Sequence, residues 1–141
     1  MTSINAFNHG LLNEISFLLK LQSSLSSHGF SIEKTRDRFA PVDYIVKSDS
    51  KVVMYLELKT RTDISNHNSF IVGRVKLERI NHYDKPTIII WVCETTGDLY
   101  YIFYSKGLLE LNQRVMKNKR ITFIPKALCG SSYDNLIDAV K

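Results

Sequence analysis

The 141-residue chain is expected to fold as an α/β protein, because three of its segments carry distinct hydrophobic patterns. Apolar residues recur at helical spacing between Leu11 and Leu25, which predicts a long amphipathic helix over residues 4–27. Residues 43–48 and 52–60 flank a run of turn-forming residues and predict a β-hairpin. Residues 87–92 are almost continuously apolar, as is typical of a central strand covered on both faces.

The remaining elements complete this α/β pattern. The sequence predicts a first strand at 30–34, a helix at 75–83, an aromatic strand at 99–104 that pairs back onto 87–92, a strand at 120–124 and a closing helix at 133–140. Residues 62–73 are polar and are expected to form a mobile loop. No repeat or linker is visible, so a core at about 4–92 and a β-rich C-terminal extension at about 98–141 are assigned to one domain, 1–141.

The amino-acid composition indicates what kind of molecule the protein binds. Lysine and arginine outnumber aspartate and glutamate by 19 to 14, and the resulting charge of +5 favours a polyanion. The two cysteines and four histidines show neither a zinc spacing nor a disulfide framework. No signal peptide or apolar run of membrane-spanning length is present, so a soluble, intracellular, cytoplasmic protein with no membrane partner is expected.

The hairpin carries the most informative residues. Side chains alternate along a strand, so Val53, Tyr55, Glu57 and Lys59 share one face, and the opposite face, with Leu56 and Leu58, is apolar. Depending on the length of the turn, Asp43 lies opposite residue 55, 56 or 57. In two of these registers Asp43 is on the Glu57 side, with paired Cβ atoms roughly 5 Å apart. Two carboxylates so close can share one cation.

The order helix, three strands, helix, strand, with Asp43 on the second strand and Glu57-Leu58-Lys59 on the third, resembles the PD-(D/E)xK nuclease superfamily. The resemblance covers about residues 4–92 and is strongest to small phage and viral nucleases and to Holliday junction resolvases. It implies a restriction-endonuclease-like αβββαβ core, with a mixed central sheet flanked by helices. One departure is that Val42 separates Pro41 from Asp43, where the family name implies an adjacent pair.

The resemblance also implies roles for individual residues. Asp43, Glu57 and the backbone carbonyl of Leu58 would bind Mg²⁺, for which Mn²⁺ substitutes. Lys59 would orient or help to deprotonate the attacking water and offset charge on the phosphate. Related enzymes often add a glutamate from the first helix. Glu14 is the acidic residue available there, and it is either such a ligand or an exposed residue beside the apolar stripe.

Several basic residues are candidates for phosphate contacts, and each could equally be a solvated surface cation. They are Arg36, Arg38, Arg61, Arg74 and Lys76, together with Lys117 and Lys119 from a basic cluster that also holds Arg114 and Arg120.

The expected function is a Mg²⁺-dependent endodeoxyribonuclease, junction-resolving or otherwise structure-selective, acting on DNA as a homodimer or higher oligomer because two strand cuts need two sites. A sequence-specific restriction or homing enzyme is the alternative within this class. A non-catalytic nucleic-acid-binding module of the same fold is a second alternative, and an unrelated basic interaction domain, in which Glu57 and Lys59 form a surface pair, is a third.

Overall fold

The computed structural model describes residues 3–35 and 42–141, with side chains described from Glu14 onward. Its main sheet has five strands in the order β1-β2-β3-β5-β6 and a second sheet has three in the order β4-β8-β7. The elements are α1 (Ser3–Ser26), β1 (Phe30–Lys34), β2 (Tyr44–Ser48), β3 (Lys51–Arg61), β4 (Ser69–Gly73), α2 (Arg74–Ile80), β5 (Thr87–Cys93), β6 (Leu99–Phe103), β7 (Gln113–Met116), β8 (Lys119–Pro125) and α3 (Tyr133–Val140).

The main sheet is mixed, which confirms the expected fold class. β3 pairs with β5 in parallel, and the β1–β2, β2–β3 and β5–β6 pairs are antiparallel. The parallel pair requires a crossover, and α2 lies within it between the two strands. β4 also lies in this crossover, so the αβββαβ order is present with one extra strand.

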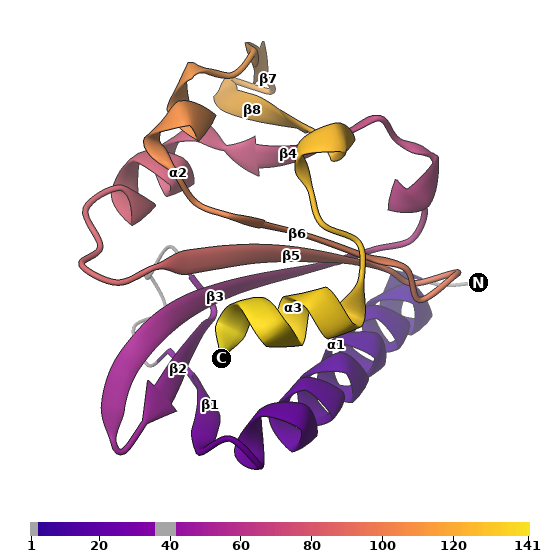
Figure 1. Ribbon diagram of the computed structural model, residues 1–141. Coiled ribbons are helices and arrows are strands. Elements are labelled where there is room, and N and C mark those ends of the chain that lie inside the picture. Colours follow the sequence, from indigo (N-terminus) through magenta and orange to yellow (C-terminus); the bar gives the residue numbers. More distant parts are fainter. Residues whose placement is uncertain (1–2, 36–41) are drawn as a thin grey trace.

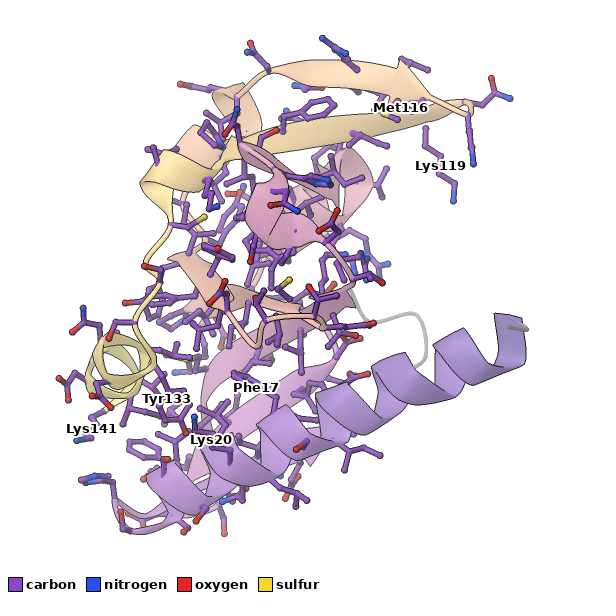
Figure 2. All side chains as sticks on the ribbon, turned by 90° about the vertical axis from the view of Figure 1, so that its right-hand side faces the viewer. Phe17, Lys20, Met116, Lys119, Tyr133 and Lys141 are labelled. Carbon is purple, nitrogen blue, oxygen red and sulfur yellow. The ribbon has the colours of Figure 1, made fainter. Side chains whose placement is uncertain are left out.

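One face of the main sheet is covered by α1 and α3 (Figure 1). Leu56 of β3 and Ile88 and Ile90 of β5 are buried there with Leu21 of α1 and Leu136 of α3. The two helices also touch each other, since the rings of Phe17 and Tyr133 meet edge to face at 6.4 Å (Figure 2). This face is an apolar core.

The other face is covered by α2 and the three-stranded sheet (Figure 1). Ile89 and Trp91 alternate with the residues of the first core along β5, and they pack against Leu77 of α2, Phe70 of β4 and Ile124 of β8. Every residue of β5 is buried, which agrees with its continuous apolar run. The site described below lies on this face.

The expectation of a mobile loop at residues 62–73 was wrong. The segment contains a 3₁₀ turn at Ile64–Asn66 and the strand β4. Phe70 and Val72 of β4 are buried and Ile71 between them is exposed. This alternation covers so few residues that it does not stand out in the sequence among polar neighbours. β7 was also missed, because all four of its residues are exposed and it has no apolar face.

No helix within the described part of the chain is long and apolar enough to cross a membrane.

The buried face of β3 should dominate stability. Leu56 is 1% exposed, so Leu56→Ala is expected to reduce the free energy of unfolding by about 2–5 kcal/mol through lost burial and a residual cavity. Urea denaturation followed by circular dichroism measures this loss. Val115→Ala is the control, because Val115 is 71% exposed and its truncation should change stability by no more than about 0.5 kcal/mol. Equal losses in the two variants would contradict the assigned core.

Candidate active site

The pairing of β2 with β3 decides where Asp43 lies. The two-residue turn leaves Ser48 opposite Lys51 and Lys47 opposite Val52, and a regular ladder continued from there would place Asp43 opposite Leu56. A β-bulge interrupts the ladder, because Val46 pairs with Met54 and leaves Val53 as an extra residue in β3. Tyr44 therefore pairs with Leu56, and the same register places Asp43 opposite Glu57.

The bulge also corrects one expectation about β3. Val53 does not share the face of Glu57, but packs with Met54 against the core under α1. Beyond the bulge the expected alternation holds, since Leu56 and Leu58 are buried in that core and Glu57 points to the opposite face. Val42 is buried as well, whereas Asp43 is half-buried.

Glu57 is buried more deeply than the pattern of an exposed strand face suggested, at 1% exposure. Its Oε2 forms an ion pair with Lys76 of α2, and Lys59 Nζ lies 3.7 Å from the same oxygen. Its Oε1 is buried and has no hydrogen-bond partner within the described part of the chain. Two amines thus share one carboxylate oxygen, and the other oxygen remains available to a ligand.

This environment changes the protonation of both β3 residues. Burial, reinforced by the nearby Asp43 carboxyl, raises the pKa of Glu57 to about 7 against the opposing effect of Lys76. Burial, and then the nearby charge of Lys76, lowers the pKa of Lys59. Glu57 therefore holds a proton more readily than an exposed carboxyl would.

Glu14 is not brought together with the two strand carboxylates. Its Oε1 accepts a hydrogen bond of 2.8 Å from the hydroxyl of Tyr44, and Tyr44 packs in the core under α1. Burial, followed by this bond to Glu14, raises the pKa of Tyr44. In the chain as described, no three His, Cys, Asp or Glu side chains are grouped so as to hold a metal ion.

The candidate phosphate contacts are dispersed. Lys76 is not a solvated surface cation, because it is 31% exposed and forms an ion pair with Glu57. Arg74 is held on the protein, because it pairs with Glu78 at 3.0 Å and donates to the carbonyl of Leu109. Lys117 lies in the turn between β7 and β8, and Lys119 begins β8. Pro41, Arg36 and Arg38 lie outside the described residues.

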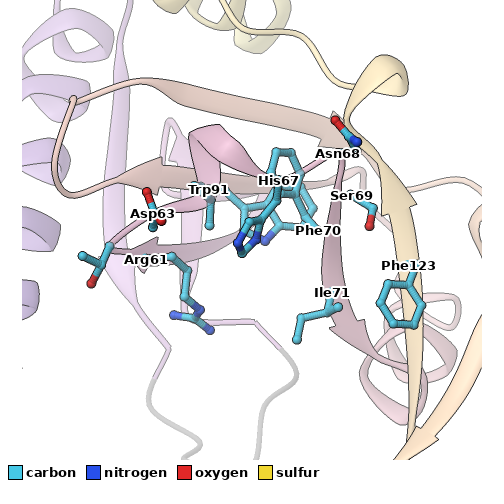
Figure 3. Close-up of a pocket in the computed structure, with 11 residues that line it drawn as sticks. Arg61, Asp63, His67, Asn68, Ser69, Phe70, Ile71, Trp91 and Phe123 are labelled. Atoms are coloured by element: carbon cyan, nitrogen blue, oxygen red, sulfur yellow. The ribbon is translucent and has the colours of Figure 1, made fainter.

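Two adjoining hollows open beside Arg61. The first, of about 590 Å³, has aromatic walls that include His67, Phe70 and Phe123, with Arg61 at one side (Figure 3). The second, of about 770 Å³, is lined by Lys59 and Arg61 of β3, by residues 71–75, and by residues 118–121 at the turn and start of β8. Arg61 and Ile71 line both hollows. Sequence reasoning missed this groove, because residues far apart in the chain form its walls.

The raised pKa of Glu57 predicts how stability depends on pH. Its folded value of about 7 lies above its ordinary value of 4.5, so the folded state retains a proton that the unfolded chain has released. As pH rises from about 4.5 to about 7, the wild type should lose stability relative to Glu57→Gln by on the order of 3 kcal/mol. Urea unfolding in EDTA at several pH values measures the difference, with Glu110→Gln as the exposed control. A difference independent of pH would show that Glu57 titrates normally.

The ion pair between Glu57 and Lys76 leads to a second, independent prediction. Lys76 lowers the pKa of Glu57, so Lys76→Met should raise that pKa above its wild-type value. Carbon NMR of labelled glutamate carboxyl groups follows the titration directly. Arg79→Met, on the exposed side of the same helix, should leave it unchanged. If the two variants titrate alike, Lys76 does not engage Glu57 in solution.

Comparison with known proteins adds a structural relationship. No protein-family model matches the sequence, and no curated protein does. Among solved structures, the fold is similar to that of D212, a nuclease from a fusselovirus, with a TM-score of 0.64 and 12% identity over 99% of this chain and 94% of that chain. Hjc, a Holliday junction resolvase from Archaeoglobus fulgidus, also matches, with a TM-score of 0.49 and 11% identity over 80% of this chain and 88% of that chain. The fold expected from the sequence is confirmed by this likeness, because the chain shares the fold of a viral nuclease over nearly its whole length.

Proposed function

We propose that the protein is a Mg²⁺-dependent endodeoxyribonuclease that hydrolyses phosphodiester bonds at Asp43, Glu57 and Lys59. The observation that carries the proposal is the bulged register, which sets Asp43 opposite Glu57 with Lys59 on the same face of β3. A protein that only binds nucleic acid gains nothing from two carboxylates facing a phosphate, because they repel it. The fold shared with a viral nuclease supports the same conclusion.

The oxygen atoms that these residues offer are of the type that Mg²⁺ prefers as ligands. Glu57 Oε1 is a buried carboxylate oxygen without a partner in the described chain, and Asp43 adds a second carboxylate across the ladder. Leu58 lies beyond the last β2–β3 pair, so its carbonyl is not used in the β2 ladder. Hard oxygen donors of this kind suit Mg²⁺, which would supply charge neutralisation at the phosphate and a lowered pKa for the attacking water. Mn²⁺ should substitute.

Lys59 has a role of its own in this chemistry. Hydrolysis forms one bond from water oxygen to phosphorus and breaks one from phosphorus to a sugar oxygen, and the water proton ends on solvent or the leaving oxygen. The lowered pKa of Lys59 brings its amine closer to proton exchange near neutral pH than that of an exposed lysine. Its charged form stabilises the negative phosphate during the reaction.

Cleavage of both strands of a duplex or junction requires two such sites, so we propose that the enzyme acts as a homodimer or higher homo-oligomer. Within this class we propose a structure-selective, junction-resolving type of activity, with a sequence-specific duplex enzyme as the alternative that the substrate panel distinguishes.

The test incubates the protein with linear, supercoiled, single-stranded and four-way-junction DNA in the presence of Mg²⁺, Mn²⁺ or EDTA. We expect cleavage only with metal, and loss of at least about 100-fold in rate for Asp43→Ala, Glu57→Ala and Lys59→Ala. DNA binding by the two acid variants, measured in EDTA, should be retained or tightened because repulsion of phosphate is relieved.

Two results would reject the proposal. Undiminished cleavage by Glu57→Ala or Lys59→Ala would show that the active site lies elsewhere. Absence of cleavage by the wild type on every substrate, with DNA binding intact, would favour the non-catalytic binding module.

A further inference from the structure

The hairpin of β7 and β8 has an unusual surface for a short ribbon. All four residues of β7 are exposed, and the hydrophobic side chains Val115 and Met116 are 71% and 45% exposed. Its charges are all positive, from Arg114, Lys117, Lys119 and Arg120, and no aspartate or glutamate occurs between Glu110 and Asp134. Exposed apolar residues beside several basic residues, with no acidic residue among them, favour a partner that offers both negative charge and an apolar surface.

The hairpin is also connected to the candidate active site. The larger hollow has Asn118, Lys119 and Arg120 on one wall and Lys59 and Arg61 on another. Figure 2 shows Met116 and Lys119 at the projecting end of this ribbon. A polyanion lying in the groove at Lys59 would therefore meet the hairpin at the same time.

We propose that the β7–β8 hairpin docks into the major groove of duplex DNA next to the phosphate held at Lys59. The basic side chains contact phosphates along the groove, and Met116, on the same face of the ribbon as Lys119, contacts the groove interior. The major groove of B-DNA is wide enough for a two-stranded β-ribbon, and apolar side chains find the thymine methyl group there. This inference rests on the proposed nuclease function, for which it identifies the element that holds the substrate duplex.

The chain contains its own matched control for this hairpin. The β2–β3 turn and the β7–β8 turn are both two-residue loops, closed by Ser48–Lys51 and by Met116–Lys119. Both central residues of each turn have positive φ, 51° and 65° at Asp49 and Ser50, and 51° and 64° at Lys117 and Asn118. Each pair of residues therefore already occupies this turn geometry in this protein. The two turns lie at opposite ends of the molecule (Figure 1).

The experiment exchanges the two turns. Variant one carries Lys117→Asp and Asn118→Ser, variant two carries Asp49→Lys and Ser50→Asn, and variant three combines all four changes and keeps the net charge of +5. Affinity for a fluorescent mixed-sequence duplex is measured by anisotropy in EDTA, between about 50 and 200 mM KCl. We expect variants one and three to bind about tenfold more weakly, with the salt dependence of log K reduced by about 1. Variant two should bind at least as well as the wild type.

A second pair of substitutions separates groove insertion from general charge attraction. Met116→Ser and Val115→Ser each leave every charge in place, and the high exposure of both side chains spares the fold. We expect Met116→Ser to weaken binding about threefold with an unchanged salt dependence, and Val115→Ser, on the opposite face of the ribbon, to bind like the wild type. Wild-type affinity in Met116→Ser would overturn insertion into the groove. Equal affinity of the wild type and variant three, which have the same net charge, would show that the position of the basic turn is irrelevant and would overturn docking of the hairpin altogether.

Because binding is measured in EDTA, these results do not depend on cleavage. Failure of the active-site variants to abolish cleavage would reject the proposed catalytic residues without affecting the hairpin result. A weakened variant one that cleaves the bound duplex at saturating DNA would separate holding of the substrate from the chemistry.

Discussion

The extra residue Val53 in β3 is the constraint on which the candidate site depends. Side chains on a strand alternate with a period of two, so a shift of one residue exchanges the faces of every side chain beyond it. With a regular ladder Asp43 would oppose Leu56, whereas the bulge brings it opposite Glu57. Packing holds this register, because Tyr44, Leu56 and Leu58 are buried together in the core under α1. Packing on the apolar face of the β2–β3 hairpin therefore fixes which residues lie opposite each other on its polar face.

Burial changes the acid–base properties of the site, first of all those of Glu57. Glu57 lies beneath α2, where desolvation raises its pKa to about 7 and Lys76 and Lys59 both approach one of its oxygens. A buried carboxylate with positive neighbours on one side and a free oxygen on the other is costly for stability but suited to binding a cation. The same desolvation lowers the pKa of Lys59. One physical cause, burial, thus raises the pKa of Glu57 and lowers that of Lys59.

The two faces of the main sheet differ in what they contain. The face under α1 and α3 is an apolar core, and the face under α2 and the second sheet contains the catalytic candidates and the groove. The strands after β6 return to this second face and add the basic β7–β8 hairpin to it. The C-terminal extension thereby forms one wall of the hollow that Lys59 lines, although its residues lie some sixty positions further along the chain.

The sequence by itself determined the elements whose patterns are strong and local. The amphipathic period of α1, the alternation of β3 and the apolar run of β5 each depend on one segment, and they led to the fold and to Asp43, Glu57 and Lys59. The tertiary structure decided the rest, because those features depend on pairs of distant segments. The bulge at Val53 selected one of three registers, α2 buried Glu57 against Lys76, and β4 and β7 became strands only by pairing with β8. A strand without an apolar face leaves no periodic signal, and only its hydrogen-bonded neighbour defines it.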